Sequence, residues 1–168
     1  MSPFVETVVA MAAIVYLLGR AKVAASALED AIIKHSLQGL DKLHKETRAE
    51  IRPAFELWWE KDQKQRAINA LREKLQDHAA ELSDEQLEST MALPLDELKS
   101  DAWHVAVHAY MGTREASLIA KLPNIGNTRE RAMASNKAHQ QGIDTASTTL
   151  VDFGVDLAEL YAHFSPAH

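Results

Sequence analysis

The first apolar segment of the chain is hydrophobic on every side of the helix that it predicts. Phe4–Leu18 reads FVETVVAMAAIVYLL, and it carries no charge after Glu6. Arg20 and Lys22 follow directly behind it. A helix without a polar face must be buried in its own core, against a partner or in a bilayer. The environment of residues 1–19 is therefore the first question about function.

Length weighs against a full membrane span. As an α-helix, residues 4–18 would be about 22 Å long, whereas the hydrocarbon core of a bilayer is about 30 Å thick. We therefore favour burial among other helices, of this chain or of a partner, with membrane insertion of residues 4–19 as the alternative. Arg20 and Lys22 would then place the C-terminal side in the cytoplasm. A cleaved secretory signal is disfavoured, because the charged residue in front of the apolar run is the acidic Glu6 and no basic residue precedes the run.

Four later segments space their apolar residues by threes and fours, as amphipathic helices do. They cover 33–51, 68–82, 95–119 and 132–164. The last segment is the most regular, because its steps of four and three alternate without interruption, and it predicts one long coiled-coil-like helix over 128–164. Together the four segments offer enough apolar surface to form a groove for the N-terminal helix.

Helix boundaries follow from the proline and capping residues. Pro53 should kink or restart a helix, and Pro94 should end one or open the next. Ser83 and Gln86 form a capping box, in which each side chain bonds the other residue's backbone amide. Residues 122–127 contain Pro, Asn and Gly and predict a loop.

The expected fold class is all-α, an elongated helical bundle of about five helices with a long coiled-coil-like C-terminal helix. We expect a single helical domain over 1–168. The net charge of −6 argues against a nucleic-acid partner, because phosphate contacts need clustered Lys and Arg. The chain has no cysteine, which removes disulfides and thiolate metal sites. This composition fits a reducing compartment, with the protein either cytoplasmic or membrane-associated and facing that compartment.

One group of residues has the spacing of metal ligands. Asp101, His104 and His108 fall on one stripe of a helix, which Glu115 continues. Two histidines four residues apart with a nearby carboxylate can converge on one Zn or Fe ion. The stripe lacks the glutamate that follows the first histidine in metalloproteases, and such histidine pairs arise often by chance. We therefore expect no cofactor, with this metal site as the alternative.

Two adjacent tryptophans predict a mixed environment. Trp58 and Trp59 point in different directions from one helix, so one should lie in the core and the other at an edge. An edge tryptophan can anchor a protein interface or mark a membrane–water interface.

Further interface positions come from the first and last apolar segments. The residues expected to contact a partner there are Phe4, Val8, Met11, Val15, Asn136, His139, Ile143, Leu150, Phe153 and Leu157. Asn136 and His139 are polar members of the last seam, so they are either solvated or buried in an assembly. If His139 is buried in one, that assembly should weaken below a pH of about 6.5.

These patterns favour a non-catalytic helical interaction protein, a scaffold, adaptor or inhibitor inside a larger assembly. Its partner would be another protein or a second copy of the chain. A membrane-anchored assembly subunit that uses residues 4–19 is the first alternative. A helical-bundle metalloprotein with a site on the 101–115 helix is the second. The sequence contains no Gly-x-Ser-x-Gly element or phosphate-binding glycine loop, so no enzyme class is indicated.

Overall fold

The computed structural model describes residues 3–166, with side chains from Ala10 onward except that of Asp77. These residues form helices joined by short turns and contain no strand, so the all-α prediction is confirmed. The elements are α1 (Pro3–Trp58), the π-helix η1 (Trp59–Gln63), α2 (Lys64–Leu75), α3 (Asp77–Glu81), α4 (Asp84–Met111), α5 (Arg114–Ala120), the 3₁₀ turn η2 (Ile125–Asn127), α6 (Thr128–Asp152) and α7 (Leu157–Phe164).

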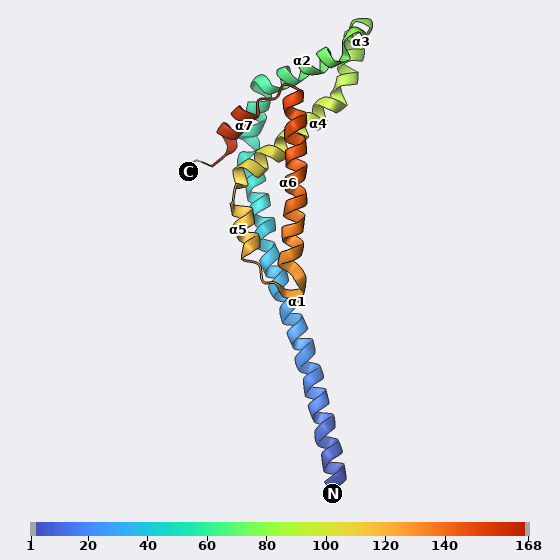
Figure 1. Cartoon of the computed structure of the whole chain (residues 1–168), viewed down its shortest axis with the longest axis vertical. Helices are drawn as coiled ribbons and strands as arrows, with labels where there is room; N and C mark the ends of the chain where they lie inside the picture. Colours follow the sequence, from blue (N-terminus) through green and yellow to red (C-terminus); the bar gives the residue numbers. More distant parts are fainter. Residues whose placement is uncertain (1–2, 167–168) are drawn as a thin grey trace.

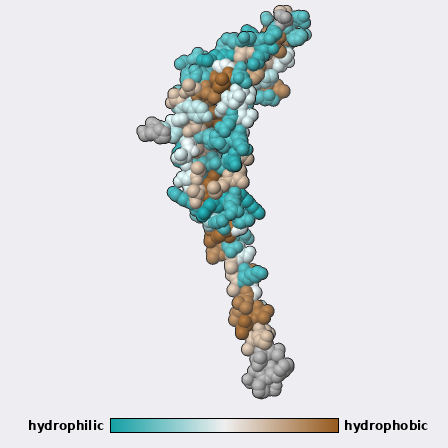
Figure 2. Space-filling view, viewed as in Figure 1, coloured by the Kyte–Doolittle hydropathy of each residue, from teal (hydrophilic) through white to brown (hydrophobic). Residues whose placement is uncertain are grey.

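The molecule consists of a helical head from which one end of α1 projects (Figure 1). We call residues 10–32 the stalk, because every side chain in that range is exposed. The head comprises residues 40–166. The N-terminus lies at the far tip of α1, and the brown apolar surface of the projecting helix is visible in Figure 2. The expected groove for this helix is absent from the described part of the chain, because the apolar seams of the head pack against one another.

Helix α1 is 56 residues long and continues through Pro53. The predicted break at that proline is wrong, and Pro94 likewise lies inside α4. A proline inside a helix normally destabilises that helix by about 3 kcal/mol. Here the neighbouring turns are held by the core, since Ile51 and Phe55 are buried on either side of Pro53. Tertiary packing thus outweighs the local preference.

The core centres on the aromatic residues at the upper end of α1. Phe55 is fully buried, and its ring lies 5.1 Å from that of Trp103 on α4. Trp58 packs edge-on against Phe164 of α7 at 5.8 Å. Such tilted pairs place ring edges against ring faces, the arrangement that aromatic quadrupoles favour. The end of α1 is thereby clamped between α4 and α7.

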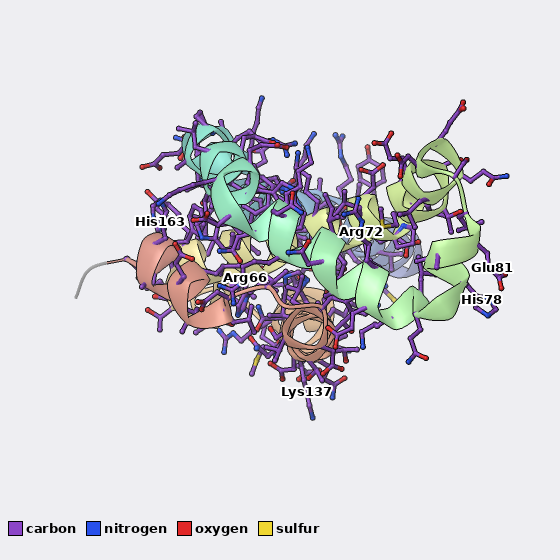
Figure 3. All side chains as sticks on the ribbon, turned by 90° about the horizontal axis from the view of Figure 1, so that it is seen from above. Arg66, Arg72, His78, Glu81, Lys137 and His163 are labelled. Atoms are coloured by element: carbon purple, nitrogen blue, oxygen red, sulfur yellow. The ribbon has the colours of Figure 1, made fainter. Side chains whose placement is uncertain are left out.

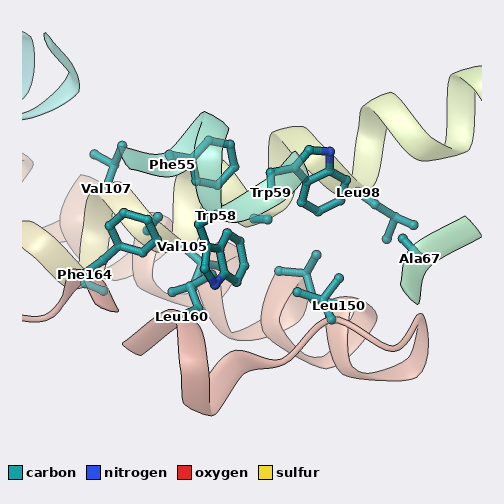
Figure 4. Packing of buried hydrophobic residues seen from close by; sticks show 14 of the residues in the cluster. Phe55, Trp58, Trp59, Ala67, Leu98, Val105, Val107, Leu150, Leu160 and Phe164 are labelled. Carbon is teal, nitrogen blue, oxygen red and sulfur yellow. The ribbon is translucent and has the colours of Figure 1, made fainter. Parts of the chain in front are cut away.

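Both tryptophans belong to this core, which corrects the prediction that one of them lies at an edge. Trp58 is 5% exposed and Trp59 is 1% exposed. Figure 4 shows the reason: Trp58 lies beside Leu160 of α7, whereas Trp59 lies beside Leu98 of α4. The two rings leave the helix in different directions, and a separate element covers each one.

A polar network joins the π-helix to the start of α7. Gln63 is fully buried, and its Nε2 donates to Oε2 of Glu159 at 2.8 Å. Its Oε1 accepts from the backbone N–H of Asp156 at 2.9 Å. Arg66 donates from Nε to the carbonyl of Gly154 at 2.8 Å. Because Gln63 is bonded at both ends of its amide, it is buried without the penalty of an unpaired polar group.

The predicted single helix over 128–164 is interrupted, and α7 is a separate helix behind a turn. Gly154 has φ +78°, and its N–H donates to the carbonyl of Val151 while Val155 donates to that of Leu150. This bond pair is the glycine-based Schellman motif that ends helices. The regular spacing of the last seam therefore continues across two helices, both of which pack on this chain's own core.

Of two further helix boundaries, one agrees with the prediction from the sequence and the other does not. The capping box is present, since Gln86 N–H donates to Ser83 Oγ at 3.3 Å and Ser83 N–H donates to Gln86 Oε1 at 3.0 Å. The 95–119 segment, by contrast, is divided where α4 ends at Gly112, which has φ +52°.

Replacing Gly154 should destabilise the protein. An alanine there would meet a positive φ and a backbone oxygen, Arg66 O, 3.3 Å from its Cβ. The left-handed conformation alone costs about 1–2 kcal/mol. We expect Gly154→Ala to lower the free energy of unfolding by at least that amount in urea titrations. Gly142→Ala, inside α6 with no atom near its Cβ, should instead raise it by about 1 kcal/mol. Equal changes in the free energy of unfolding for the two variants would contradict the left-handed conformation assigned to Gly154.

Candidate functional site

A cleft of about 620 Å³ with polar and apolar walls lies at the lower end of the head, where α1 leaves the other helices. We call it the lower cleft. α1 contributes His44, α5 contributes Glu115, and α6 contributes Asn136 and His139. Leu40 and other apolar side chains complete the wall. The cleft therefore gathers titratable groups from three separate helices.

The cleft contains a histidine–carboxylate pair that spans two elements. His44 Nε2 lies 2.9 Å from Glu115 Oε1, and the side chains are 31% and 11% exposed. The second carboxylate oxygen, Oε2, is buried and has no hydrogen-bond partner among the described residues. The pair ties α5 to α1 in a partly desolvated setting, where a charge-assisted hydrogen bond is stronger than at the surface.

A second pair of titratable groups lies between α4 and α6. The rings of His108 and His139 are 5.8 Å apart in an edge-on arrangement. His139 keeps an exposed edge, yet its partial burial lowers its pKa below the usual value of 6.5. Glu115 opposes this shift in pKa by favouring the charged ring. His108, His104 and His44 lower the pKa further, because each would carry a like charge.

The predicted metal ligands do not converge. His104 is exposed, and its Nδ1 lies 2.8 Å from the carbonyl oxygen of Ser100. His108 faces His139 on another helix instead. Over the described residues, no three His, Asp or Glu side chains are arranged to hold a metal ion. The stripe of Asp101, His104 and His108 thus does not become a ligand set, because its members meet different surroundings.

Several predicted interface residues are covered by this chain itself. Trp58, Trp59, Ile143 and Leu150 are at most 5% exposed, so this chain's own core covers them. Phe153 and Leu157 are half-buried against the same core. The physical reason is that the last seam packs on α4 and on the upper end of α1 inside the head.

The other predicted interface residues lie in the lower cleft or on the stalk. Asn136 and His139 line the cleft. Met11 and Val15 are exposed on the stalk, at 61% and 68%. Phe4 and Val8 belong to α1, but their side chains lie outside the described part of the structure.

The stalk presents large apolar side chains that no other helix of the described chain covers. They are Met11, Ile14, Val15, Tyr16, Leu17, Leu18, Val23, Leu28 and Ile32. By length and composition, this is the one helix among the described residues that could cross a membrane, and its apolar window is 0% buried. A core helix of similar composition would be mostly buried, whereas this one is exposed.

No family model, curated protein or solved structure matches the chain. The geometry of the stalk and of the lower cleft therefore carries the functional argument.

The His44–Glu115 pair should contribute measurably to stability. We expect a double-mutant cycle with His44→Gln and Glu115→Gln to give a coupling energy of about 1–2 kcal/mol near neutral pH, because the pair is partly buried. The same cycle on Lys42 and Glu46, which are 74% and 63% exposed, is the control and should give about 0.5 kcal/mol or less. Urea titration of the four variants measures each coupling. Indistinguishable couplings would show that the buried pair has no special role.

Proposed function

We propose that the protein is a membrane-anchored subunit of a protein assembly, with its N-terminal helix inserted in the bilayer and its head acting through contact surfaces. The observation that supports this is the exposure of an all-round apolar helix that the chain's own head leaves uncovered. The short length of the apolar segment favoured burial among helices over membrane insertion. The uncovered stalk now favours membrane insertion.

The direction of the exposed side chains distinguishes lipid from a protein groove. Five consecutive residues, from Ile14 to Leu18, are each more than half exposed. Consecutive helical residues differ by about 100° in direction, so these five surround the helix completely. A groove on one partner covers one stripe, whereas lipid covers every side. Each large apolar side chain gains about 1.5–3 kcal/mol when it leaves water.

The length of the segment suits a short span with assistance from its flanking residues. Residues 3–19 extend over about 26 Å as a helix. Arg20 and Lys22 can extend their charged ends toward the headgroups, which lengthens the tolerated span. The guanidinium of Arg20 lies 5.9 Å from the ring centroid of Tyr16, and its Nη1 donates to the tyrosine oxygen at 3.2 Å. Tyrosine and arginine together are typical of the membrane–water interface.

The part of α1 between Gly19 and the head would hold the head away from the bilayer. From Gly19 to Leu40 the helix rises about 30 Å. Because α1 is continuous into the core, the spacer and the head form one stiff body. This layout supports a scaffold or adaptor role at a fixed height above the membrane.

A protein partner on the stalk is the second candidate, and one observation favours it. Val23 and Leu28 lie beyond Lys22, are 71% and 62% exposed, and would remain in water if the membrane segment ended at Gly19. A helix of another subunit could cover them, which agrees with the interaction role expected from the sequence.

Membrane attachment predicts a specific fractionation behaviour. The full-length protein should sediment with membranes, resist extraction by high salt and enter solution in detergent. Val15→Arg should release much of it, because a central charge costs about 2.5–3.5 kcal/mol in a membrane helix. Leu93→Arg is the matched control at a residue of the head that is 69% exposed, and it should leave the protein in the membrane fraction. Soluble, monodisperse wild-type protein without detergent would contradict the proposal.

The charges behind the anchor predict its orientation. Arg20 and Lys22 should keep the head on the cytoplasmic side of the membrane. Because the chain has no cysteine, Lys137→Cys introduces a single thiol on an outward-pointing residue of α6 (Figure 3). A membrane-impermeant maleimide should label this thiol only after the membrane is permeabilised. Labelling in intact cells would show the opposite orientation.

A further inference from the structure

The lower cleft has the size and enclosure of a small-molecule site. α1 and α6 form its side walls, and α5, which packs against both helices, lies at its base. Glu115 and Ile119 of α5 line the cleft and are only 8% and 5% exposed. The volume of about 620 Å³ falls within the usual range of ligand pockets, about 300–1,000 Å³. The cleft can therefore hold an organic molecule of modest size.

Part of the cleft lining is apolar and remains in contact with water. Leu37 and Leu40 contribute this part from α1, and Ala132 contributes from α6. Leu37 is 38% exposed, and Leu40 is half-buried. An apolar group in the cleft would remove both leucines from water, which is favourable in proportion to the area covered. The occupant that fits this part of the lining has an apolar body.

The unpaired charge on the cleft wall is positive. Lys45 and Arg48 lie one helical turn apart on α1, and both line the cleft. Neither forms an ion pair with any residue that the structure describes, and the same holds for Asp41. Glu115 adds no free anion, because its Oε1 lies 2.9 Å from His44 Nε2 and its Oε2 is buried. Two cations and one carboxylate leave one positive charge that a monoanion would balance.

The facing wall on α6 adds neutral hydrogen-bonding groups. Ser135, Asn136 and His139 lie on one face of α6, since residues three and four apart are neighbours on a helix. The serine hydroxyl and the asparagine amide can each donate to an oxygen of an anion. Arginine has the planar fork of N–H groups that matches the two oxygens of a carboxylate. The two walls together thus suit a carboxylate.

We propose that the lower cleft binds a small organic carboxylate. Lys45 and Arg48 hold its charged group, and Leu37 and Leu40 cover its apolar body. The bound molecule lies between α1 and α6 and gives the head a ligand-binding activity beyond the proposed anchoring and scaffolding function. This site belongs to the head alone, so it does not depend on whether the stalk lies in a membrane.

Methyl NMR on the full-length protein in a neutral detergent tests the site, with naphthoate as the probe. Ile119 reports from the base of the cleft, and Ile68 of α2 in the upper head is the internal control. Naphthoate should shift the Ile119 methyl signal saturably and leave that of Ile68 in place, because aromatic ring currents act only at short range. The neutral naphthamide should bind at least about tenfold more weakly, since it lacks the charge. An unshifted Ile119 signal, or equal affinity for the two probes, would overturn the proposal.

Glutamine variants assign the affinity to the α1 wall. Lys45→Gln and Arg48→Gln should each weaken naphthoate binding by about tenfold and leave the binding of naphthamide unchanged. Lys42→Gln, on the same helix but outside the cleft lining, is the matched control and should retain the wild-type affinity. The Ile68 signal verifies in each variant that the head is folded. Undiminished naphthoate binding in both cleft variants, or an equal loss in Lys42→Gln, would show that these cations do not hold the carboxylate.

Discussion

The aromatic packing at the upper end of α1 is the contact on which the rest of the structure depends. Phe55, Trp58 and Trp59 bring α4 and α7 onto a helix that would otherwise be a free rod. Each large aromatic buries about 150–250 Å², and α1 remains helical through Pro53 beside this packing. Because the same helix continues outward as the stalk, the core that organises the head also orients the exposed apolar segment.

Two polar regions flank this core, and they differ in how well their groups are paired. At the upper end, Gln63 is bonded through both ends of its amide, and the turn before α7 is thereby secured. At the lower end, Glu115 keeps one buried oxygen without a partner in the described structure, and His139 faces other histidines. A fully paired network rigidifies its surroundings, whereas an unpaired buried polar group is costly. The polar groups near α7 are therefore better paired than those of the lower cleft.

The two ends of α1 suit complementary tasks. Its outer end carries large exposed apolar side chains, and the guanidinium of Arg20 lies over the ring of Tyr16 there. Its inner end is enclosed by α4 and α7. One continuous helix joins these two ends. This arrangement places the exposed apolar stalk and the packed head on one continuous helix.

The amino-acid sequence by itself determined the helical class, the capping box at Ser83 and the unusual apolar character of residues 4–18, because these depend on composition and on neighbours within a few positions. Only the tertiary structure decided which apolar seams would pack together. Pro53 remained inside a helix because the core holds the turns around it, whereas Gly154 ended a helix although the apolar spacing continued without interruption. Periodicity records which faces are apolar but not which partner covers them. The candidate site shows the same limit: His44 and Glu115 are 71 positions apart, and chain folding alone brings them together.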